Sequence, residues 1–356
     1  MKLVTYTHGA IARPGLLVTS GTRDAGEATG ADAARSEARV LDLLRAMAWV
    51  DGKQSGAPKS ERPFAEKFGD SVLHFIERAR DARPLAVEAL AAHGRGELPT
   101  KNDAGAIVMP ASEVTLLAPI PRPPSMRDGY AFRQHVETAR KNRGLEMIPE
   151  FDQFPVFYFT NHQAVIGPGP LRVRPRHLEK LDFELEAAIV VGRETRDLTA
   201  ENADEAIFGM TIMNDFSARA LQMQEMLLSL GPAKGKDFAT GIGPYLVTMD
   251  ELAERTTKTP KGNVFDLGMR AFVNGVKVSQ GNVNDMTWTF AQILERASYG
   301  VTLFPGDVIG SGTCGTGCFL ELNGSKITKD QWLKPGDVVA LEIDRLGRLE
   351  NNVVTD

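Results

Sequence analysis

Apolar residues recur at two different spacings along the chain, and those in the first part favour helices. Between residues 31 and 50 the apolar positions fall three or four apart, which is the spacing of a buried helix face. The elements expected in this part are two short strands followed by three helices: 2–5, 16–20, 31–50, 70–79 and 84–93. We therefore expect residues 1–113 to form a small α/β domain.

The pattern changes after residue 113. A proline-rich break (PIPRPP, 119–124) precedes residues 125–150, which are polar, basic and aromatic with poor spacing for a core, so we expect a mobile lid or functional loop there. From residue 154 onward, short apolar runs predict strands, including a hairpin that turns at Asn274-Gly275. Residues 114–356 should therefore form a second, mainly β domain, and the whole chain is expected to be α+β.

The bulk composition is that of an ordinary globular protein. Of its 356 residues, 42% are hydrophobic and 24% charged, and a net charge of −5 gives no sign of a nucleic-acid or anionic-membrane partner. The N-terminus lacks the apolar run of a signal peptide, and no stretch approaches the roughly 18 apolar residues of a membrane span. Cys314 and Cys318 lack the two further ligands of a zinc site. We expect a cytoplasmic protein with two reduced thiols.

The first candidate for chemistry is the segment LDFELEAAIVVG, residues 181–192. Read as a strand, it places Glu184 and Glu186 on one face, because side chains alternate with a period of two. Two half-buried carboxylates repel each other unless a cation lies between them, and oxygen ligands suit Mg²⁺ or Mn²⁺. The alternative is a solvated sheet face that binds no ion.

A second candidate follows the next apolar strand. Asp215 ends that strand, and Asp215 or Ser217 is expected to cap a helix over 217–228. On this helix Arg219 and Gln222 are three residues apart and share a face, which suits a metal with an anionic ligand; a surface salt bridge of Arg219 is the alternative.

Three further stretches carry polar residues of less certain meaning. Asp128, Tyr130 and His135 lie within eight residues of one another, but a surface loop can hold such residues by chance. Lys236 lies in a glycine-rich loop that lacks the phosphate-loop pattern. Residues 311–321, also glycine-rich, are expected to lead into a strand bearing Glu321.

Taken in order, these segments resemble the fumarylacetoacetate hydrolase family. The matching runs are D-x-Y-x(4)-H at 128–135, PVFY at 155–158, LDFELE at 181–186, MNDFSARALQ at 213–222, GKDFAT at 235–240 and SGT…LEL at 311–322. Their order and spacing agree over roughly residues 114–345, about two thirds of the chain. The resemblance implies a distorted β-roll catalytic domain, in a homodimer, often preceded by a smaller N-terminal domain.

The resemblance also implies a set of site residues. One divalent cation, Mg²⁺ or alternatively Mn²⁺ or Ca²⁺, would be bound by four carboxylates: Asp128, Glu184, Glu186 and Asp215. Lys236 and Thr240 match positions linked to a second cation or to the oxyanion. The positions that match substrate-binding residues are Tyr130, Tyr158, Arg219, Gln222 and Thr313.

These residue types suit the cleavage of a carbon–carbon bond between two carbonyls. His135 is the candidate general base for water, Glu321 would orient its imidazole, and Lys236 would stabilise an oxyanion. We therefore expect a metal-dependent hydrolase of a 2,4-dioxo acid in aromatic or sugar catabolism. A 2-oxo acid decarboxylase, hydratase or isomerase on the same metal site is the alternative, and a non-catalytic binding protein is a third possibility.

Two departures from the family pattern bear on the substrate. Met226 stands where fumarylacetoacetate hydrolase proper has a tyrosine, and about one extra residue precedes Lys236. We therefore expect an acylpyruvate or a sugar-derived diketo acid in preference to fumarylacetoacetate itself.

Overall fold

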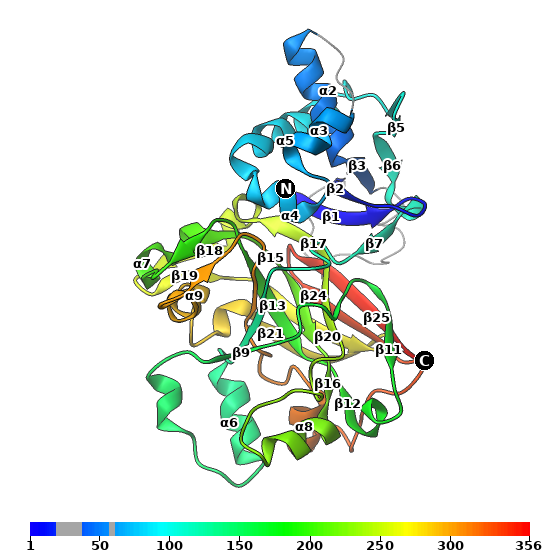
Figure 1. Cartoon of the computed structure of the whole chain (residues 1–356). Helices are drawn as coiled ribbons and strands as arrows, with labels where there is room; N and C mark the ends of the chain where they lie inside the picture. Colours follow the sequence, from blue (N-terminus) through cyan, green and yellow to red (C-terminus); the bar gives the residue numbers. More distant parts are fainter. Residues whose placement is uncertain (19–37, 57–60) are drawn as a thin grey trace.

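The computed structural model describes residues 1–18, 38–56 and 61–356 of the chain (Figure 1). Its largest element is a 12-stranded sheet. The main path, in spatial order, is β6 (Val108–Pro110), β3 (Arg39–Asp42), β2 (Ala12–Val18), β1 (Lys2–Thr7), β17 (Thr240–Thr248), β15 (Ile207–Asp215), β13 (Leu185–Val191), β23 (Val308–Gly310), β8 (Met126–Gly129) and β9 (Phe157–Phe159). Two strands join it from the side, β7 (Thr115–Leu117) on β1 and β10 (Val165–Ile166) on β17.

The N-terminal strands extend this sheet through β1, which pairs antiparallel with β17. Among the described residues, four helices lie over this part, at the upper end of Figure 1: α2 (Leu43–Ser55), α3 (Glu61–Phe68), α4 (Val72–Glu77) and α5 (Ala79–Gly94). A buried apolar cluster joins them to the sheet, with Leu3 and Leu246 among its members. One continuous sheet therefore includes strands of both predicted domains. The expected domain boundary at residue 113 stays a prediction.

A five-stranded sheet packs against the larger one, with β24 and β25 facing β15. Its order is β11 (Gly169–Val173), β25 (Gly347–Thr355), β24 (Val338–Ile343), β20 (Gly268–Val273) and β21 (Val276–Asn282). The facing side chains, such as Ile212 of one sheet and Leu341 of the other, belong to one buried cluster. The remaining short strands pair as β4 (Lys101–Asn102) with β5 (Gly105–Ala106), β12 (Leu181–Asp182) with β16 (Ser217–Ala218), β14 (Thr195–Arg196) with β22 (Thr302–Leu303), and β18 (Thr256–Thr259) with β19 (Gly262–Phe265).

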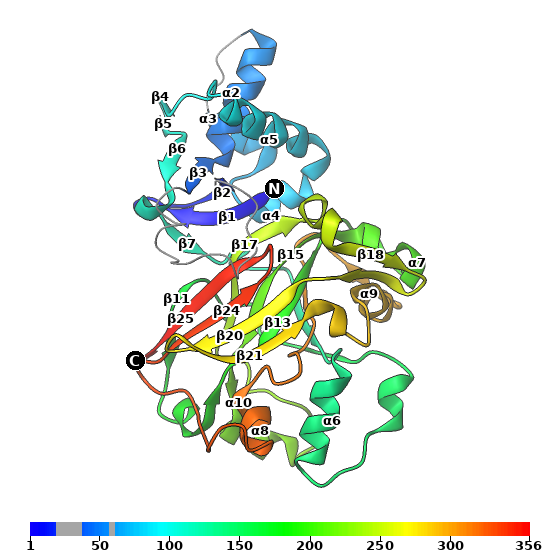
Figure 2. The same cartoon turned by 180° about the vertical axis from the view of Figure 1, so that it is seen from behind.

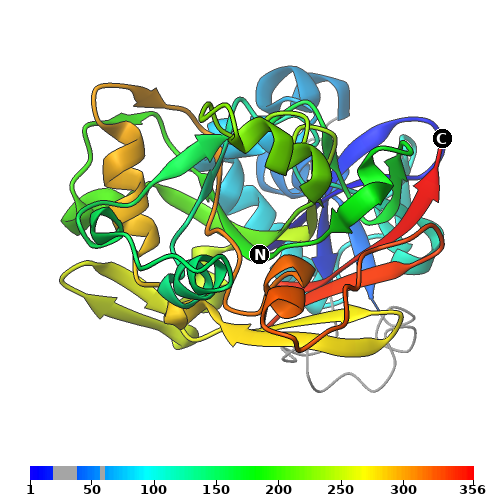
Figure 3. The same ribbon diagram turned by 90° about the horizontal axis from the view of Figure 1, so that it is seen from below.

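Three helices gather at the end of the molecule opposite the N-terminal helices, as Figures 1 and 2 show and as Figure 3 views from below. They are α6 (Arg133–Lys141), α8 (Arg219–Met226) and α10 (Phe319–Gly324). Elsewhere α7 (Ala200–Ala203) packs on α9 (Phe290–Ser298), at one side of the large sheet. No helix within the described ranges is long and apolar enough to cross a membrane.

The predicted fold class is confirmed: the structure is a mixed chain with more strand than helix. The hairpin at Asn274-Gly275 is also confirmed, since β20 and β21 flank these two residues and both have positive φ, as a type I′ turn requires.

Two of the predicted elements are wrong in part. The predicted helix over 31–50 includes residues 39–42, but these form β3, between β2 and β6. The observed helix α2 begins only at Leu43, and residues 31–37 lie outside the described residues. Residues 125–150 do not form a loop throughout, because they contain β8 and α6. In both places long-range pairing or packing, which sequence spacing does not report, decides the local structure.

Candidate active site

Four carboxylates converge on three strands of the large sheet, β15, β13 and β8. Asp128 lies in β8, Glu186 in β13 and Asp215 at the end of β15, with Glu184 just before β13. β23 lies between β8 and β13, so that Gly310 pairs with Asp128. One oxygen from each carboxylate lies within 4.8 Å of the others, and all four side chains are buried.

A glycine keeps the space between these carboxylates open. A Cβ atom at Gly310 would lie 2.4 Å from Asp128 Oδ1, 2.8 Å from the sulfur of Met213 and 3.0 Å from Glu186 Oε2. Such distances are shorter than van der Waals contact, so any larger residue at this position would push into the cluster.

Burial, together with mutual repulsion, raises the pKa of three of the four carboxyl groups. Burial, and then the neighbouring Asp215, raises the pKa of Asp128 to about 8. Burial and Asp128 likewise raise the pKa of Glu186 well above its usual value, and burial raises that of Asp215 despite the nearby Lys236. For Glu184 burial also disfavours the charged form, but Lys236 and Arg219 outweigh it and lower the pKa to about 2. A further positive charge at this place would relieve the repulsion.

The donor set fits a hard divalent cation such as Mg²⁺. Both carboxylate oxygens of Glu186 and the Oδ1 atom of Asp215 are buried without a hydrogen-bond partner among the described residues. Buried carboxylate oxygens without partners are rare in proteins, and an all-oxygen site is what Mg²⁺, Mn²⁺ and Ca²⁺ prefer. The four residues that the family resemblance implies as ligands are therefore brought together.

Two buried cations neutralise part of this charge. Lys236 Nζ lies 2.5 Å from Glu184 Oε2 and 2.6 Å from Asp215 Oδ2. Arg219 donates through Nη2 to Glu184 Oε1 at 2.8 Å and through Nη1 to Gln222 Oε1 at 3.0 Å, which confirms that Arg219 and Gln222 share a helix face. Burial alone would lower the pKa of Lys236, but Asp215 and Glu184 raise it above its usual value, so the ammonium stays charged.

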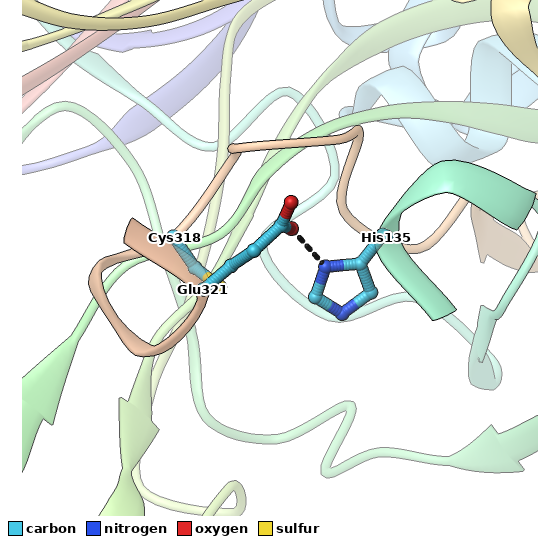
Figure 4. A group of neighbouring side chains, drawn as sticks. All are labelled: His135, Cys318 and Glu321. Atoms are coloured by element: carbon cyan, nitrogen blue, oxygen red, sulfur yellow. Dashed lines mark hydrogen bonds and ion pairs between the residues drawn. The ribbon is translucent and has the colours of Figure 1, made fainter. Parts of the chain in front are cut away.

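His135 and Glu321 form a buried pair beside the cluster (Figure 4). His135 Nδ1 lies 2.6 Å from Glu321 Oε2, and the other oxygen of Glu321 accepts from the Thr316 backbone N–H at 2.9 Å. His135 is also one of the groups that lower the pKa of Glu184, after Lys236 and Arg219. Cys318 belongs to the same group of potential ligands; it and Cys314 are buried, free thiols.

The structure corrects the local setting of two site residues. Glu321 lies in the first turn of α10 and not on a strand. Asp215 and Ser217 do not cap α8: its N-cap residue is Ala218, and Asp215 instead contacts Lys236 and Tyr158. The Asp215 carboxylate lies against Lys236 and the other three carboxylates, so it does not reach the N-terminus of α8.

The other predicted site residues surround the carboxylates. Tyr158 pairs across from Asp128 and donates its hydroxyl to Asp215 Oδ2. Thr240 pairs in register with Asp215, and Thr313 is buried next to β13. The ring of Tyr130 lies edge-on to His135 with centroids 5.7 Å apart. Their roles toward a substrate stay predictions.

Sequence reasoning missed Asp182, whose side chain is fully buried. It accepts from Arg219 Nε at 2.8 Å and from the backbone N–H groups of Phe319 at 2.7 Å and Leu320 at 3.0 Å. The signal was available, since Asp182 precedes Glu184 by two residues and continues the same alternation.

The chain is similar to known proteins over most of its length. The family model described as fumarylacetoacetate (FAA) hydrolase C-terminal matches residues 125–354. A mitochondrial oxaloacetate tautomerase of Homo sapiens is 31% identical over 286 residues, covering 80% of each chain. A fumarylacetoacetase of Oryza sativa subsp. japonica is 33% identical over 290 residues, covering 66% of each chain. Among solved structures, a fumarylacetoacetate hydrolase from Exiguobacterium antarcticum covers the whole of both chains with a TM-score of 0.64 and 24% identity.

Proposed function

Because the chain belongs to the fumarylacetoacetate hydrolase family, we propose that it is a metal-dependent enzyme that interconverts the keto and enol forms of a 2-oxo dicarboxylic acid. Oxaloacetate is the first candidate substrate. The observation that carries the proposal is the buried His135–Glu321 pair beside four carboxylates, in a chain 31% identical to an oxaloacetate tautomerase. The sequence alone favoured a carbon–carbon hydrolase, and the relatives favour the isomerase alternative.

Substrate binding would use the cationic side of the site. Asp128, Glu184, Glu186 and Asp215 would hold the divalent cation, which would withdraw electrons from the C2 oxygen and so acidify the C3 protons. The guanidinium of Arg219 has the planar donor geometry that binds a carboxylate. Its three nitrogens are oriented by hydrogen bonds to Asp182, Gln222 and Glu184.

His135 is the group best placed to move the proton. Its Nδ1 atom is hydrogen-bonded to Glu321, so Nε2 is the atom available to accept a proton from C3 of the keto acid. Glu321 then balances the charge of the imidazolium, and the same nitrogen returns the proton to the C2 oxygen to give the enol. The reverse sequence gives the keto form. One proton leaves carbon and one reaches oxygen, so that no other reactant is needed.

Hydrolysis of a 2,4-dioxo acid is the second candidate, supported by the fumarylacetoacetase relative and by the same residue pair. In that reaction His135 Nε2 would accept a proton from water instead of from carbon. The two candidates share every side chain named so far, so the products must separate them.

The test supplies enol-oxaloacetate with an excess of malate dehydrogenase, which reduces the keto form, in the presence of Mg²⁺, Mn²⁺ or EDTA. We expect keto formation to be accelerated by the protein with a divalent cation and not with EDTA, while His135→Gln leaves only the spontaneous rate. Pyruvate released stoichiometrically from acetylpyruvate, with no acceleration of keto formation, would instead establish the hydrolase. Pyruvate formed from oxaloacetate would establish a decarboxylase.

Three attributes go with the proposal. We propose Mg²⁺ as the physiological ion, a homodimer as the assembly and the cytoplasm as the location. Light scattering of the purified protein tests the dimer, and the ion is tested by comparing turnover at equal free concentrations of Mg²⁺, Mn²⁺ and Ca²⁺.

A further inference from the structure

We propose that Asp182 is a positioning residue that holds the proton-transfer pair and the substrate-binding guanidinium in one arrangement. Its contacts are independent of the substrate, but its effect on turnover rests on the function proposed above. Asp182 lies in β12, two residues before Glu184, and its side chain is fully buried.

The first of its two functions is to cap helix α10 from a distant part of the chain. The N-cap residue of α10, Cys318, makes no side-chain capping hydrogen bond, although its backbone has the extended conformation of an N-cap. Asp182 supplies the cap instead, because Oδ1 accepts from the Phe319 N–H and Oδ2 from the Leu320 N–H. A helix of only six residues depends strongly on such a cap, since it contains few internal hydrogen bonds.

The cap acts on Glu321 because this residue lies in the first turn of α10. Glu321 in turn contacts His135 Nδ1 at 2.6 Å, a distance at which a small displacement of the helix weakens or breaks the hydrogen bond. Loss of this bond would free the imidazole to change its ring orientation and its tautomer. The carboxylate of Asp182 thus fixes the direction of the nitrogen that transfers the proton.

The second function concerns Arg219. Its Nε atom donates to Asp182 Oδ2 at 2.8 Å, and Nη2 donates to Glu184 at 2.8 Å. The third contact, of Nη1 with Gln222, lies within helix α8 itself, so Asp182 and Glu184 together fix the plane of the guanidinium relative to the rest of the site. Asp182 therefore hydrogen-bonds both to the guanidinium and to the helix bearing Glu321.

A purely structural role is the competing explanation, and the chain contains a matched control for it. Asp42 is also fully buried, also accepts from an arginine Nε, that of Arg13, and also caps a helix, by accepting from the Arg45 N–H at 3.0 Å. It lies on β3, in the N-terminal part of the sheet, away from α8 and α10 (Figure 1). Asp42→Asn thus removes the same kind of contact where no site residue depends on it.

The experiment compares Asp182→Asn with Asp42→Asn. In Asp182→Asn, Oδ1 can still accept from Phe319, but an NH₂ group replaces Oδ2 and faces two donors, Leu320 N–H and Arg219 Nε–H. We expect kcat to fall about 10–100-fold and KM for oxaloacetate to rise several-fold, as when groups that orient catalytic side chains are lost. Asp42→Asn should leave both constants within about twofold of the wild type.

A proton NMR spectrum of the substrate-free protein tests the positioning without turnover. The proton between His135 Nδ1 and Glu321 should give a downfield resonance, which His135→Gln identifies by removing it. We expect the wild type and Asp42→Asn to keep this resonance and Asp182→Asn to lose or shift it. A wild type that does not act on oxaloacetate would overturn the proposed function, while the resonance would still decide the role of Asp182.

A double variant separates the two functions and covers the case in which Asp182→Asn alone does not fold. Serine at position 318 can cap α10 locally, so Asp182→Asn/Cys318→Ser should recover the resonance and most of kcat while KM stays raised. Asp182→Asn with an unchanged resonance, or with kinetic losses no larger than those of Asp42→Asn, would overturn the proposal.

Discussion

Replacing Asp128 by asparagine should stabilise the metal-free protein and at the same time remove its response to a divalent cation. Asparagine has nearly the same shape and can still accept the Gly312 N–H, which donates to Asp128 Oδ1 at 3.1 Å. The substitution therefore replaces a group that must either carry a buried charge or take up a proton on folding with one that is always neutral.

The magnitude follows from the raised pKa of Asp128, about 8 in the folded protein against about 3.9 in an unfolded chain. Between these values the folded state binds a proton that the unfolded state does not, so the free energy of unfolding falls as pH rises. The slope is about 1.4 kcal/mol per pH unit, which amounts to roughly 4 kcal/mol by pH 7. A buried amide that is incompletely hydrogen-bonded costs about 1–3 kcal/mol in return. We therefore expect a net gain of about 1–3 kcal/mol at pH 7. At pH 5 the proton-linked term is only about 1.5 kcal/mol, so the amide cost should cancel it or leave Asp128→Asn slightly less stable than the wild type.

Urea denaturation in EDTA at pH 5, 6 and 7, repeated with saturating Mn²⁺, measures both effects. The wild type should gain about 2.7 kcal/mol when Mn²⁺ reaches about 100 times its Kd, and Asp128→Asn should gain nothing. Asp42→Asn, which breaks a carboxylate–arginine pair, should lose stability and keep its response to Mn²⁺. An Asp128→Asn protein that is less stable in EDTA at every pH, or that still responds to Mn²⁺, would refute the reasoning.

Three further substitutions test the site. Gly310→Ala places a methyl group 2.4 Å from Asp128 Oδ1 and should abolish Mn²⁺ binding measured by calorimetry, whereas Gly94→Ala, with no atom within 4 Å of the new Cβ, should bind Mn²⁺ as the wild type does. His135→Gln should lower keto–enol turnover by about 10²–10⁴ while Mn²⁺ binding stays unchanged, and a loss of binding would place His135 among the ligands instead. Lys236→Met removes the cation between Glu184 and Asp215 and should cost about 3–5 kcal/mol of unfolding free energy in EDTA; an unchanged urea midpoint would contradict the buried ion pairs.

The carboxylate cluster was predictable because much of its pattern is local. Glu184 and Glu186 are two residues apart in a segment rich in β-branched residues, and alternation alone places them on one face. That Asp128 and Asp215 join them depends on β8, β13 and β15 lying close together in one sheet, which only the family resemblance implied.

The proton-transfer pair was harder to place. α6 buries only His135 and Val136 and exposes or half-exposes its other residues, so its sequence lacks the wide apolar face that identifies a helix. The run CFLEL before and after Glu321 reads as a strand, and it becomes a helix where Asp182, from another part of the chain, accepts its first N–H groups. Neither the burial of His135 nor the capping of α10 by Asp182 is determined by residues close in the sequence.

The proton transfer itself is the central claim, and hydrogen exchange at C3 of oxaloacetate measures it most directly. The keto acid is incubated in deuterium oxide with the protein and Mg²⁺, and deuterium at C3 is followed by NMR together with any pyruvate. We predict exchange well above the spontaneous rate, abolished by EDTA and by His135→Gln, with no pyruvate formed. Exchange no faster than in the absence of protein, or pyruvate formed without exchange, would contradict the account.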